Sequence, residues 1–429
     1  MDRNPILLYK TLVVGIIILF IITGFNTLTA AVIEQKPIQP LYNGNTLYVG
    51  GSGEGNYTKI QDAIDNASDG DTVFVYSGFY NITNFIIINK SIALIGENKF
   101  NTIINGSAIS IEVPKVNVSG FTIQNGFGIM ISNNFEEFDN NCIYDNIFKS
   151  SEDLIWFSGI TISNSSYNTI SDNTFINCSL MIVSSYHNSI NNNTINDKPL
   201  VYFEGASNEV IDEAGQVILI DCQDITVENL ELNNLFISIE MIDSFNCLIS
   251  HNKFSNNAIA GFFINSSNNI ISGNIFLNNF VGLGFIYCRE NNLTKNSFKS
   301  NGGILFFETS TCNLVSYNNF KYTYKSFNLN IISVESDNKW FKNFWNRPRL
   351  LPKIIWNFKT SKLKNLPLMP TFPDIDWRPA IKPNEINGAD SDYTEPIVLE
   401  NNIKISHNSF FNMFLDRLPL LEGLLYLMR

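Results

Sequence analysis

Histidine, paired cysteines and runs of basic residues are scarce in this chain of 429 residues. The three histidines, His187, His251 and His407, are dispersed, and no two cysteines form a Cys-x-x-Cys pair, so zinc-site spacing is absent. Lysine and arginine number 28 against 40 aspartates and glutamates, which gives a formal net charge of −12. Such a chain would repel a phosphate backbone, and we expect no nucleic-acid partner.

The composition nevertheless supplies a large core. Hydrophobic residues make up 45% of the chain and charged residues 16%, which excludes the signature of a disordered protein. Six cysteines are scattered along it, and their positions favour small buried side chains, with disulfide pairing outside the cell as the alternative. They are Cys142, Cys178, Cys222, Cys247, Cys288 and Cys312.

The N-terminus has the pattern of an export segment. Arg3 and Lys10 precede an apolar run over residues 11–33, with small residues near its end at Ala30 and Ala31. Residues 1–33 therefore predict either a cleaved secretory signal or an uncleaved membrane anchor, because the run is also long enough to span a bilayer. In both cases the rest of the chain lies outside the cytoplasm, secreted or at the cell surface.

A motif with a constant spacing of 22 fills the second half of the chain. Apolar, asparagine and aromatic positions recur together, so each kind of residue forms its own column. The asparagine column is Asn252, Asn274, Asn296 and Asn318. The aromatic column is Leu232, Phe254, Phe276, Phe298 and Phe320. Two further apolar columns are Val227, Ile249, Ile271, Leu293 and Val315, and Met241, Phe263, Phe285, Phe307 and Leu329.

This repeat predicts an all-β fold, a single-stranded right-handed parallel β-helix. Its apolar residues are β-branched or aromatic and alternate with short Asn/Ser/Gly turns, which is typical of strands. Stacked coils place equal positions above one another, so Phe254, Phe276 and Phe298 should form one interior file. Asparagine tolerates left-handed turn geometry and its amides can stack, so we interpret the asparagine column as a structural ladder.

The ends of the solenoid need covers, because an open end exposes apolar side chains and strand edges. The tryptophans Trp340, Trp345, Trp356 and Trp377 should plug the last coil, with a sugar-binding aromatic platform as the alternative. Asp416, Arg417 and Glu422 interrupt the amphipathic tail too often for a bilayer span. The predicted segments are the β-helix at 46–336 with a cap helix at 57–67, an aromatic and Pro-rich cap at 337–383, a linker at 384–404 and a short amphipathic C-terminal helix at 405–429.

The opening and the coils resemble a known family. The opening reads Leu47-Tyr-Val-Gly-Gly-Ser-Gly-Glu-Gly-Asn-Tyr-Thr-Lys-Ile-Gln-Asp-Ala-Ile-Asp-Asn-Ala67, then Gly70-Asp-Thr-Val-Phe-Val-Tyr-Ser-Gly-Phe-Tyr80. With the Asn-rich coils it resembles pectate-lyase-like right-handed β-helices, and most of all the branch described as NosD-like or carbohydrate-binding and sugar hydrolysis repeats. The stretches 343–352 and 376–379 resemble endings of archaeal cell-surface members. The resemblance implies an envelope protein that contacts polysaccharide, and it fixes no activity.

No catalytic residue can be assigned from the sequence. Hydrolysis on this fold needs converging carboxylates, and lyase chemistry needs a basic residue beside a calcium-bound uronate. Neither set is visible in the chain. A copper role, which the NosD-like resemblance suggests, needs His, Cys or Met ligands that converge, and none do so visibly.

The best site candidate follows from the 22-residue register. Asp221 and Asp243 differ by 22, and Asn265 is next in their column. Stacked carboxylates repel unless a cation or proton lies between them, so the column predicts a calcium site or an acid/base pair. An exposed turn column that tolerates aspartate is the alternative. We expect no other cofactor.

A second acidic column has the same spacing. Glu209 and Glu231 differ by 22, with Lys253 next, which is typical of a surface ion pair. Three functions stay open: a non-enzymatic envelope protein that binds glycans or neighbouring surface proteins, a polysaccharide lyase, hydrolase or epimerase, and a metal-maturation accessory protein. Convergence of carboxylates and a basic residue in one groove would favour the enzyme.

Overall fold

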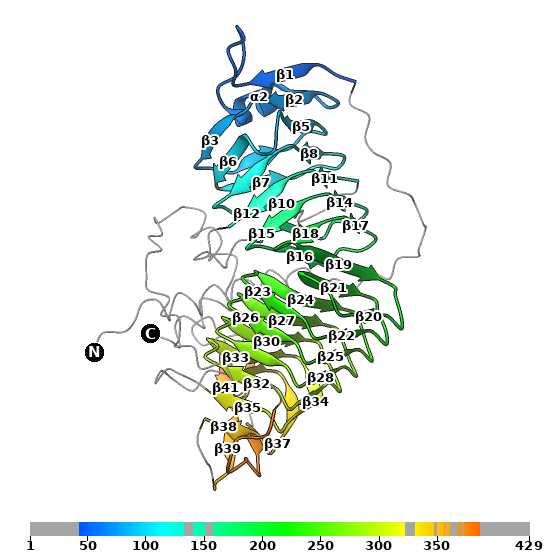
Figure 1. The fold of residues 1–429 in the computed structure, drawn as a ribbon, viewed down its shortest axis with the longest axis vertical. Helices are drawn as coiled ribbons and strands as arrows, with labels where there is room; N and C mark the ends of the chain where they lie inside the picture. The colour runs from blue at the N-terminus through cyan, green and yellow to red at the C-terminus, as the bar shows by residue number, and fades with distance from the viewer. Residues whose placement is uncertain are drawn as a thin grey trace, which may run out of the picture.

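The structure is a β-solenoid of about 12 turns with coils of about 22 residues (Figure 1). It is a computed structural model, and it describes residues 43–132, 140–150, 158–321, 331–346, 350–355, 357–360, 368–370 and 373–386. The predicted export segment at 1–33, nearly all of the linker and the C-terminal helix at 405–429 lie outside these residues. No helix in the described ranges is long and apolar enough to cross a membrane.

A short helix covers the N-terminal end of the solenoid. Helix α2 (Ile60–Asn66) packs its apolar face onto the first strands, and it is the one helix within the described ranges. It is shorter than the predicted range of 57–67, because Tyr57 forms a bridge with Val49 and is committed to the sheet. The cap helix is therefore present, and strand pairing at its entrance shortens it.

The first stack of coils is built from residues 46–195. Each coil contributes one strand to a seven-stranded sheet, one to a five-stranded sheet and one to a long sheet that runs the length of the molecule, here called the central sheet. The seven-stranded sheet is β1 (Thr46–Val49), β2 (Thr72–Val75), β5 (Ala93–Gly96), β8 (Asn117–Ser119), β11 (Cys142–Tyr144), β14 (Thr169–Ser171) and β17 (Ser189–Asn191). The five-stranded sheet is β4 (Ile86–Ile88), β7 (Ala108–Ile111), β10 (Gly128–Ser132), β13 (Ile160–Ser163) and β16 (Leu180–Val183).

The second stack begins at residue 200 and has the same three-sided plan. Its other two sides are a nine-stranded and a six-stranded sheet. The central sheet joins both stacks: β3 (Gly78–Ile82), β6 (Thr102–Gly106), β9 (Thr122–Gln124), β12 (Ile147–Lys149), β15 (Thr174–Ile176), β18 (Thr194–Ile195), β19 (Lys198–Glu204), β21 (Gln216–Ile220), β24 (Ile237–Ile242), β27 (Ile259–Ile264), β30 (Val281–Ile286), β33 (Gly303–Glu308), β36 (Ile331–Val334), β40 (Asn357–Thr360) and β41 (Leu368–Pro370). The nine-stranded sheet is β20 (Val210–Ile211), β22 (Thr226–Glu228), β25 (Leu248–Ser250), β28 (Ile270–Ser272), β31 (Asn292–Thr294), β34 (Thr311–Ser316), β37 (Asp337–Phe341), β42 (Asp374–Asp376) and β39 (Lys353–Ile355). The six-stranded sheet is β23 (Glu231–Asn233), β26 (Lys253–Ser255), β29 (Ile275–Leu277), β32 (Ser297–Lys299), β35 (Asn319–Lys321) and β38 (Phe344–Trp345).

The predicted register of 22 is confirmed through the second stack. Phe254 pairs with Phe276, and Phe276 with Phe298, in parallel strands. Their rings stack with centroids 4.9 and 4.5 Å apart and interplanar angles of 6°. Phe320 and then Trp345 continue the same buried file. Offset stacking adds roughly 0.5–1.5 kcal/mol per aromatic pair beyond the area it buries, so this file is a main contributor to the core.

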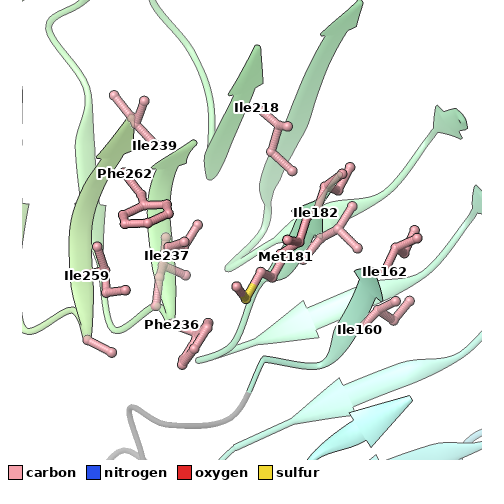
Figure 2. Packing of buried hydrophobic residues seen from close by; sticks show 14 of the residues in the cluster. Ile160, Ile162, Met181, Ile182, Ile218, Phe236, Ile237, Ile239, Ile259 and Phe262 are labelled. Carbon is pink, nitrogen blue, oxygen red and sulfur yellow. The ribbon is translucent and has the colours of Figure 1, made fainter. Parts of the chain in front are cut away.

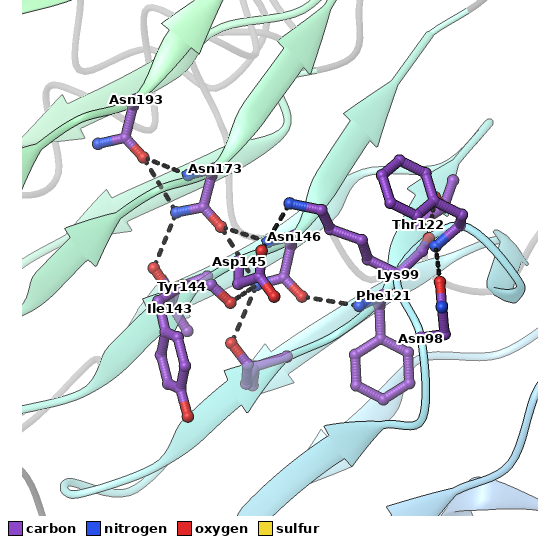
Figure 3. A network of polar contacts seen from close by, with 12 residues as sticks. Asn98, Lys99, Phe121, Thr122, Ile143, Tyr144, Asp145, Asn146, Asn173 and Asn193 are labelled. Atoms are coloured by element: carbon purple, nitrogen blue, oxygen red, sulfur yellow. Dashed lines mark hydrogen bonds and ion pairs between the residues drawn. The ribbon is translucent and has the colours of Figure 1, made fainter.

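Buried asparagines form a hydrogen-bonded ladder beside the aromatic file. The Asn252 side-chain Nδ2 donates to Asn274 Oδ1 (3.1 Å), and the Asn252 backbone N–H donates to the same oxygen (2.9 Å). The pattern repeats between Asn274, Asn296 and Asn318. Figure 3 shows the equivalent ladder of the first stack through Asn146, Asn173 and Asn193. The buried amides of these runs are thereby satisfied by the neighbouring coils.

The last coils are longer than the repeat. Phe307 pairs with Ser333, not with Leu329 as the 22-residue spacing predicted, because the spacing in this coil widens to 26. The β-helix also continues past residue 336, where we expected it to end: β37 and β38 extend the nine- and six-stranded sheets. The inserted residues change the coil length while the interior positions stay stacked.

Two aspartates of β42 close the C-terminal end. Asp374 Oδ2 accepts the Trp340 indole N–H (3.1 Å), and Asp376 Oδ2 accepts that of Trp345 (3.0 Å). Both tryptophans are buried in the last coil, as expected of a plug, whereas Trp377 is 69% exposed and does not belong to it. Trp356 lies outside the described residues.

The cysteines are small core residues, with one exception. Five are buried, and no disulfide forms among the six. Cys222 and Cys288 occupy the column that serine fills in neighbouring coils, and the Cys222 backbone N–H donates to Ser244 Oγ. Cys312 is exposed, in a left-handed turn with φ of 61°, so the expectation of burial is wrong at this position.

The two stacks meet at a seam where the register breaks. β19 turns back and pairs antiparallel with β18, and then pairs parallel with β21, with Leu200 opposite Gln216. We call the turn of the solenoid from Leu200 to Gly215 the short coil. It has no strand on the third side, so the six-stranded sheet starts only with β23, while the seven-stranded sheet ends at β17 and the five-stranded sheet at β16. The seam thus leaves strand edges that backbone pairing does not cover.

Candidate functional site

Side chains from both stacks converge in the turns beside the seam. The Tyr186 hydroxyl, from the turn after β16, donates to Asp243 Oδ2 at 2.8 Å, although the two residues are 57 apart in sequence. Asp243 Oδ1 accepts the Asn265 side-chain N–H at 2.5 Å. The carboxylate of Asp243 is therefore shared between a tyrosine of the first stack and an amide of the second.

Glu204 makes a second link across the seam. Its two carboxylate oxygens accept the His187 backbone N–H at 2.7 and 2.8 Å. His187 Nδ1 lies 3.1 Å from Glu204 Oε1, and the Tyr202 hydroxyl donates to Oε2 at 2.6 Å. The Tyr167 ring lies against the imidazole, with centroids 5.3 Å apart. We call Tyr167, Tyr186, His187, Tyr202, Glu204 and Asp243 the seam cluster.

Local backbone geometry places these side chains on the rim. His187 has φ of 58°, and Asp221 and Asp243 have φ of 50° and 51°, all in the left-handed region. Aspartate and asparagine adopt this region more readily than most residues, because their short side chains bond locally. Each such turn points the side chain away from the packed interior. The cluster is half-exposed as a result: the His187 and Glu204 side chains are 38% and 19% exposed.

The tyrosines of the cluster stay protonated. Burial, followed by the nearby Asp243 carboxylate and its hydrogen bond, raises the pKa of Tyr186 well above its usual value. Burial and Glu204 raise the pKa of Tyr202 in the same way. Both hydroxyls therefore act as hydrogen-bond donors, and neither is available as a general base at neutral pH.

The predicted column of Asp221, Asp243 and Asn265 lies at this rim. The three residues occupy equivalent turn positions, since the Asp221 N–H donates to Ile242 O and the Asp243 N–H to Ile264 O. Of the three, Asp243 and Asn265 are joined by a hydrogen bond. The structure does not test whether calcium binds there, and that hypothesis stays a prediction. In the described part of the chain, no three His, Cys, Asp or Glu side chains gather as a metal site would require.

The second acidic column is partly wrong. Glu231 pairs with Lys253 as the spacing predicted. Glu209 does not stack on Glu231, because its carbonyl accepts the Thr226 N–H next to the short coil. The missing strand at the seam removes Glu209 from the column.

A small cleft opens where that strand is missing. Its volume is about 160 Å³. Asn196 Nδ2 donates to Asn233 O across it at 3.2 Å. Lys198 and Glu231 bring one charge of each sign to its wall. The lining residues are Ile195, Asn196, Lys198, Gly215, Glu231 and Asn233.

Sequence reasoning missed most of the seam cluster. Tyr167 and His187 belong to coils of the first stack with a spacing of 20, and Glu204 belongs to the short coil, so a search at 22 could not align them. The one available signal was the repeated Ser-Ser-Tyr, at 165–167 and 184–186, next to the asparagines of the first ladder. It shows two turns with aromatic side chains, but not that the chain brings Asp243 to them.

The fold defines a class before any particular relative is considered. The stacked parallel strands form a right-handed β-helix, and residues 200–336 match the family model described as "Right handed beta helix region". The match covers the second stack up to the last full repeat. A search among curated proteins found no match.

Several solved β-helix structures are similar in part. A PL6 family alginate lyase, AlyGC, is 12% identical with a TM-score of 0.27, over 82% of this chain and 59% of the lyase. The A-module of the mannuronan C-5 epimerase AlgE4 of Azotobacter vinelandii is 13% identical with a TM-score of 0.22, over 66% of this chain and 89% of the module. PfbA, a surface adhesin of Streptococcus pneumoniae, is 11% identical with a TM-score of 0.29, over 73% and 90%. Such low values carry no conclusion about function, and this chain spans less than two thirds of the lyase.

Proposed function

We propose that the protein is an extracytoplasmic β-helix that binds glycans without catalysis, and that it does so at the seam cluster. The observation that supports this is the half-exposed group of three tyrosine rings with Glu204, Asp243 and His187 on one rim. A sugar ring presents C–H groups on its faces and hydroxyls on its edge. Aromatic rings complement the former, and carboxylates and imidazole the latter.

The charge of the rim narrows the proposal. Glu204, Asp221 and Asp243 place three carboxylates here, and His187 is the one basic side chain of the cluster. A polyuronate would meet like charge at this rim, whereas a neutral or amino-substituted glycan would not. We therefore expect neutral or amino glycans as ligands, with other envelope components as the alternative partners.

A glycan array tests the proposal directly. The purified chain is applied to immobilised neutral, amino and uronate polysaccharides, and retention is scored. Tyr167→Ala should weaken retention by about tenfold, the loss of one stacked ring at an exposed site. Tyr317→Ala is the matched control, because Tyr317 is a turn tyrosine distant in sequence, beneath Lys342. No retention on any polysaccharide, or equal loss in both variants, would remove the proposal.

One observation favours an enzyme as the second candidate. His187 Nδ1 lies 3.1 Å from Glu204 Oε1, the arrangement by which a carboxylate orients an imidazole for proton transfer. In that case wild type, but not His187→Ala, would release reducing or unsaturated products from the retained polysaccharide. Binding without product favours the first proposal.

A metal-maturation role is the third candidate, and it rests on the sequence resemblance alone. An N-terminal membrane anchor belongs to the proposal of an envelope protein as well. Protease treatment of intact cells tests the location, since an outward-facing solenoid should be cleaved without lysis.

A further inference from the structure

Side chains, in place of backbone, join the two stacks on one side of the seam. β16 is the last strand of its sheet, so its outer edge meets no following strand. The Leu180 N–H donates to Gln216 Oε1 at 3.0 Å, and Gln216 Nε2 donates back to Leu180 O at 2.5 Å. The Ile182 N–H donates to Glu240 Oε2 at 3.0 Å. Gln216 and Glu240 thus take the place of a neighbouring strand.

The contact also includes apolar packing and one bond in the opposite direction. Figure 2 shows Met181 and Ile182 of β16 close to Phe236, Ile237 and Phe262 of the second stack. The Ile237 N–H donates to Ser179 Oγ at 3.0 Å. The edge of β16 is therefore sealed against β24, and Glu240 lies within the seal.

Glu240 has an apolar, uncharged environment. Its side chain is fully buried, and its register partners on either side are Ile218 and Phe262. The described strands packed against it, β16, β21 and β27, hold no ionisable side chain. The one basic group on the turns beside these strands, His187, is bonded to Glu204. The ionisable groups on those turns are Cys178, Tyr186, His187, Asp221, Cys222 and Asp243.

The two caps differ in one chemical property. Gln216 is a neutral amide with both polar atoms bonded, whereas Glu240 Oε1 is buried without a partner. A carboxylate anion here would be desolvated with a single backbone donor to compensate it, which disfavours the charged form. Burial accordingly raises the pKa of Glu240 to about 8. At neutral pH the side chain is mainly a carboxylic acid, close in shape to glutamine.

We propose that the seam is a pH-sensitive joint, in which neutral Glu240 holds β16 against β24 and loss of its proton to solvent loosens the two stacks. The sign follows from the direction of the shift. The pKa of this acid is higher in the folded chain than its ordinary value of 4.5, so the folded state binds the proton more tightly. The stabilisation is complete below that ordinary value and is lost as the pH rises through about 8.

Hydrogen exchange of the β16 amides tests this joint in the full chain. After correction for the intrinsic pH dependence of exchange, protection at Leu180 and Ile182 should fall by at least about tenfold between pH ~6 and pH ~9. Amides of β28 and β31, inside the second stack, are the internal reference and should keep their protection. Flat protection at β16 in the wild type would overturn the proposal.

Two variants separate the role of the proton from a structural role. Glu240→Gln keeps the shape and the acceptor oxygen without the titration, so protection at Ile182 should become independent of pH. The same fall in this variant as in the wild type would contradict the proposal. Gln216→Glu adds a second buried acid at the same edge, and should make the loss of protection larger at Leu180. A wild-type profile for Gln216→Glu would count equally against it.

Discussion

Asp376 takes the place of the next asparagine beside Asn343. Its Oδ2 accepts the Asn343 backbone N–H at 3.1 Å and the Asn343 side-chain N–H at 3.2 Å, the two bonds that each rung of the ladder otherwise gives to the following rung. The same oxygen accepts the indole N–H of Trp345. One carboxylate oxygen thus terminates both the asparagine ladder and the aromatic file.

Removing this terminal acceptor should destabilise the C-terminal end. Asp376→Ala leaves three buried donors without a partner, and unsatisfied buried groups cost roughly 1–3 kcal/mol each. We expect a loss of about 3–5 kcal/mol in the free energy of unfolding, measured by denaturant titration. Asp376→Asn keeps an acceptor oxygen and should lose much less. Equal losses in the two variants would show that the carboxylate is not a ladder terminus.

An interior rung should be as sensitive as the end. Asn274 accepts two bonds from Asn252 and donates to Ile249 O and Asn296 Oδ1. Asn274→Ala should therefore cost about 3 kcal/mol, read as a lower midpoint of thermal unfolding. Asn256→Gly is the control, since φ of 56° suits glycine and the change should stay within about 0.5 kcal/mol.

The aromatic file predicts a cavity effect. Phe276 is fully buried between Phe254 and Phe298, so Phe276→Ala removes a stacked ring from both neighbours. The expected cost is about 3–5 kcal/mol. Phe100→Ala, at a ring that is 68% exposed, should be nearly neutral in the same urea titration. A small effect at Phe276 would contradict its place in the core.

Stability should fall, not rise, as the solution becomes less acidic. Burial and the nearby Glu335 raise the pKa of Glu308 from 4.5 to about 7. The folded state therefore holds this proton more tightly than the unfolded state, so the stabilisation is present below 4.5 and lost as the pH rises through about 7. This group alone should account for a decrease on the order of 2–3 kcal/mol.

Glu308→Gln is the variant that isolates this term. It should flatten the fall between pH ~5 and pH ~7 and leave the later fall that Glu240 causes. Thermal unfolding followed across this range by circular dichroism gives both profiles. A wild type that gains stability over the range would show that other carboxylates, with pKa values lowered by folding, dominate.

Calcium binding at the Asp221–Asp243 column has its own test. If the ion binds the folded chain, the unfolding midpoint should rise with calcium concentration, by mass action. Asp221→Asn should abolish the rise, because Asp243 already accepts bonds from Tyr186 and Asn265. An unchanged midpoint in millimolar calcium would remove the hypothesis.

The regular part of the fold could be predicted because interior positions carry the repeat. Phe254, Phe276 and Phe298 share one spacing because each coil must supply a side chain to the same place in the core. The expectation failed at Leu329, where the spacing widens to 26 and Ser333 takes the position. An insertion in a turn leaves no trace in the hydrophobic pattern on either side of it.

The seam could not be predicted for a different physical reason. Gln216 and Glu240 replace backbone pairing by side-chain bonds to residues 36 and 58 positions away, and such contacts have no periodic signature. The one local sign is a polar residue within a strand whose every residue is buried, as in β24. The seam cluster was hidden for the same reason, since Tyr186 and Asp243 meet only because the register slips.

The short coil has a consequence for how this molecule can change in length. Below it, every coil presents the same edge to the next, so a unit such as residues 252–273 could be duplicated and the newcomer would find matching partners on both sides. Growth or shortening there would move the C-terminal end by one strand spacing, roughly 4.8 Å, per unit. The binding rim and the joint above it would stay as they are, which lets reach and recognition vary independently.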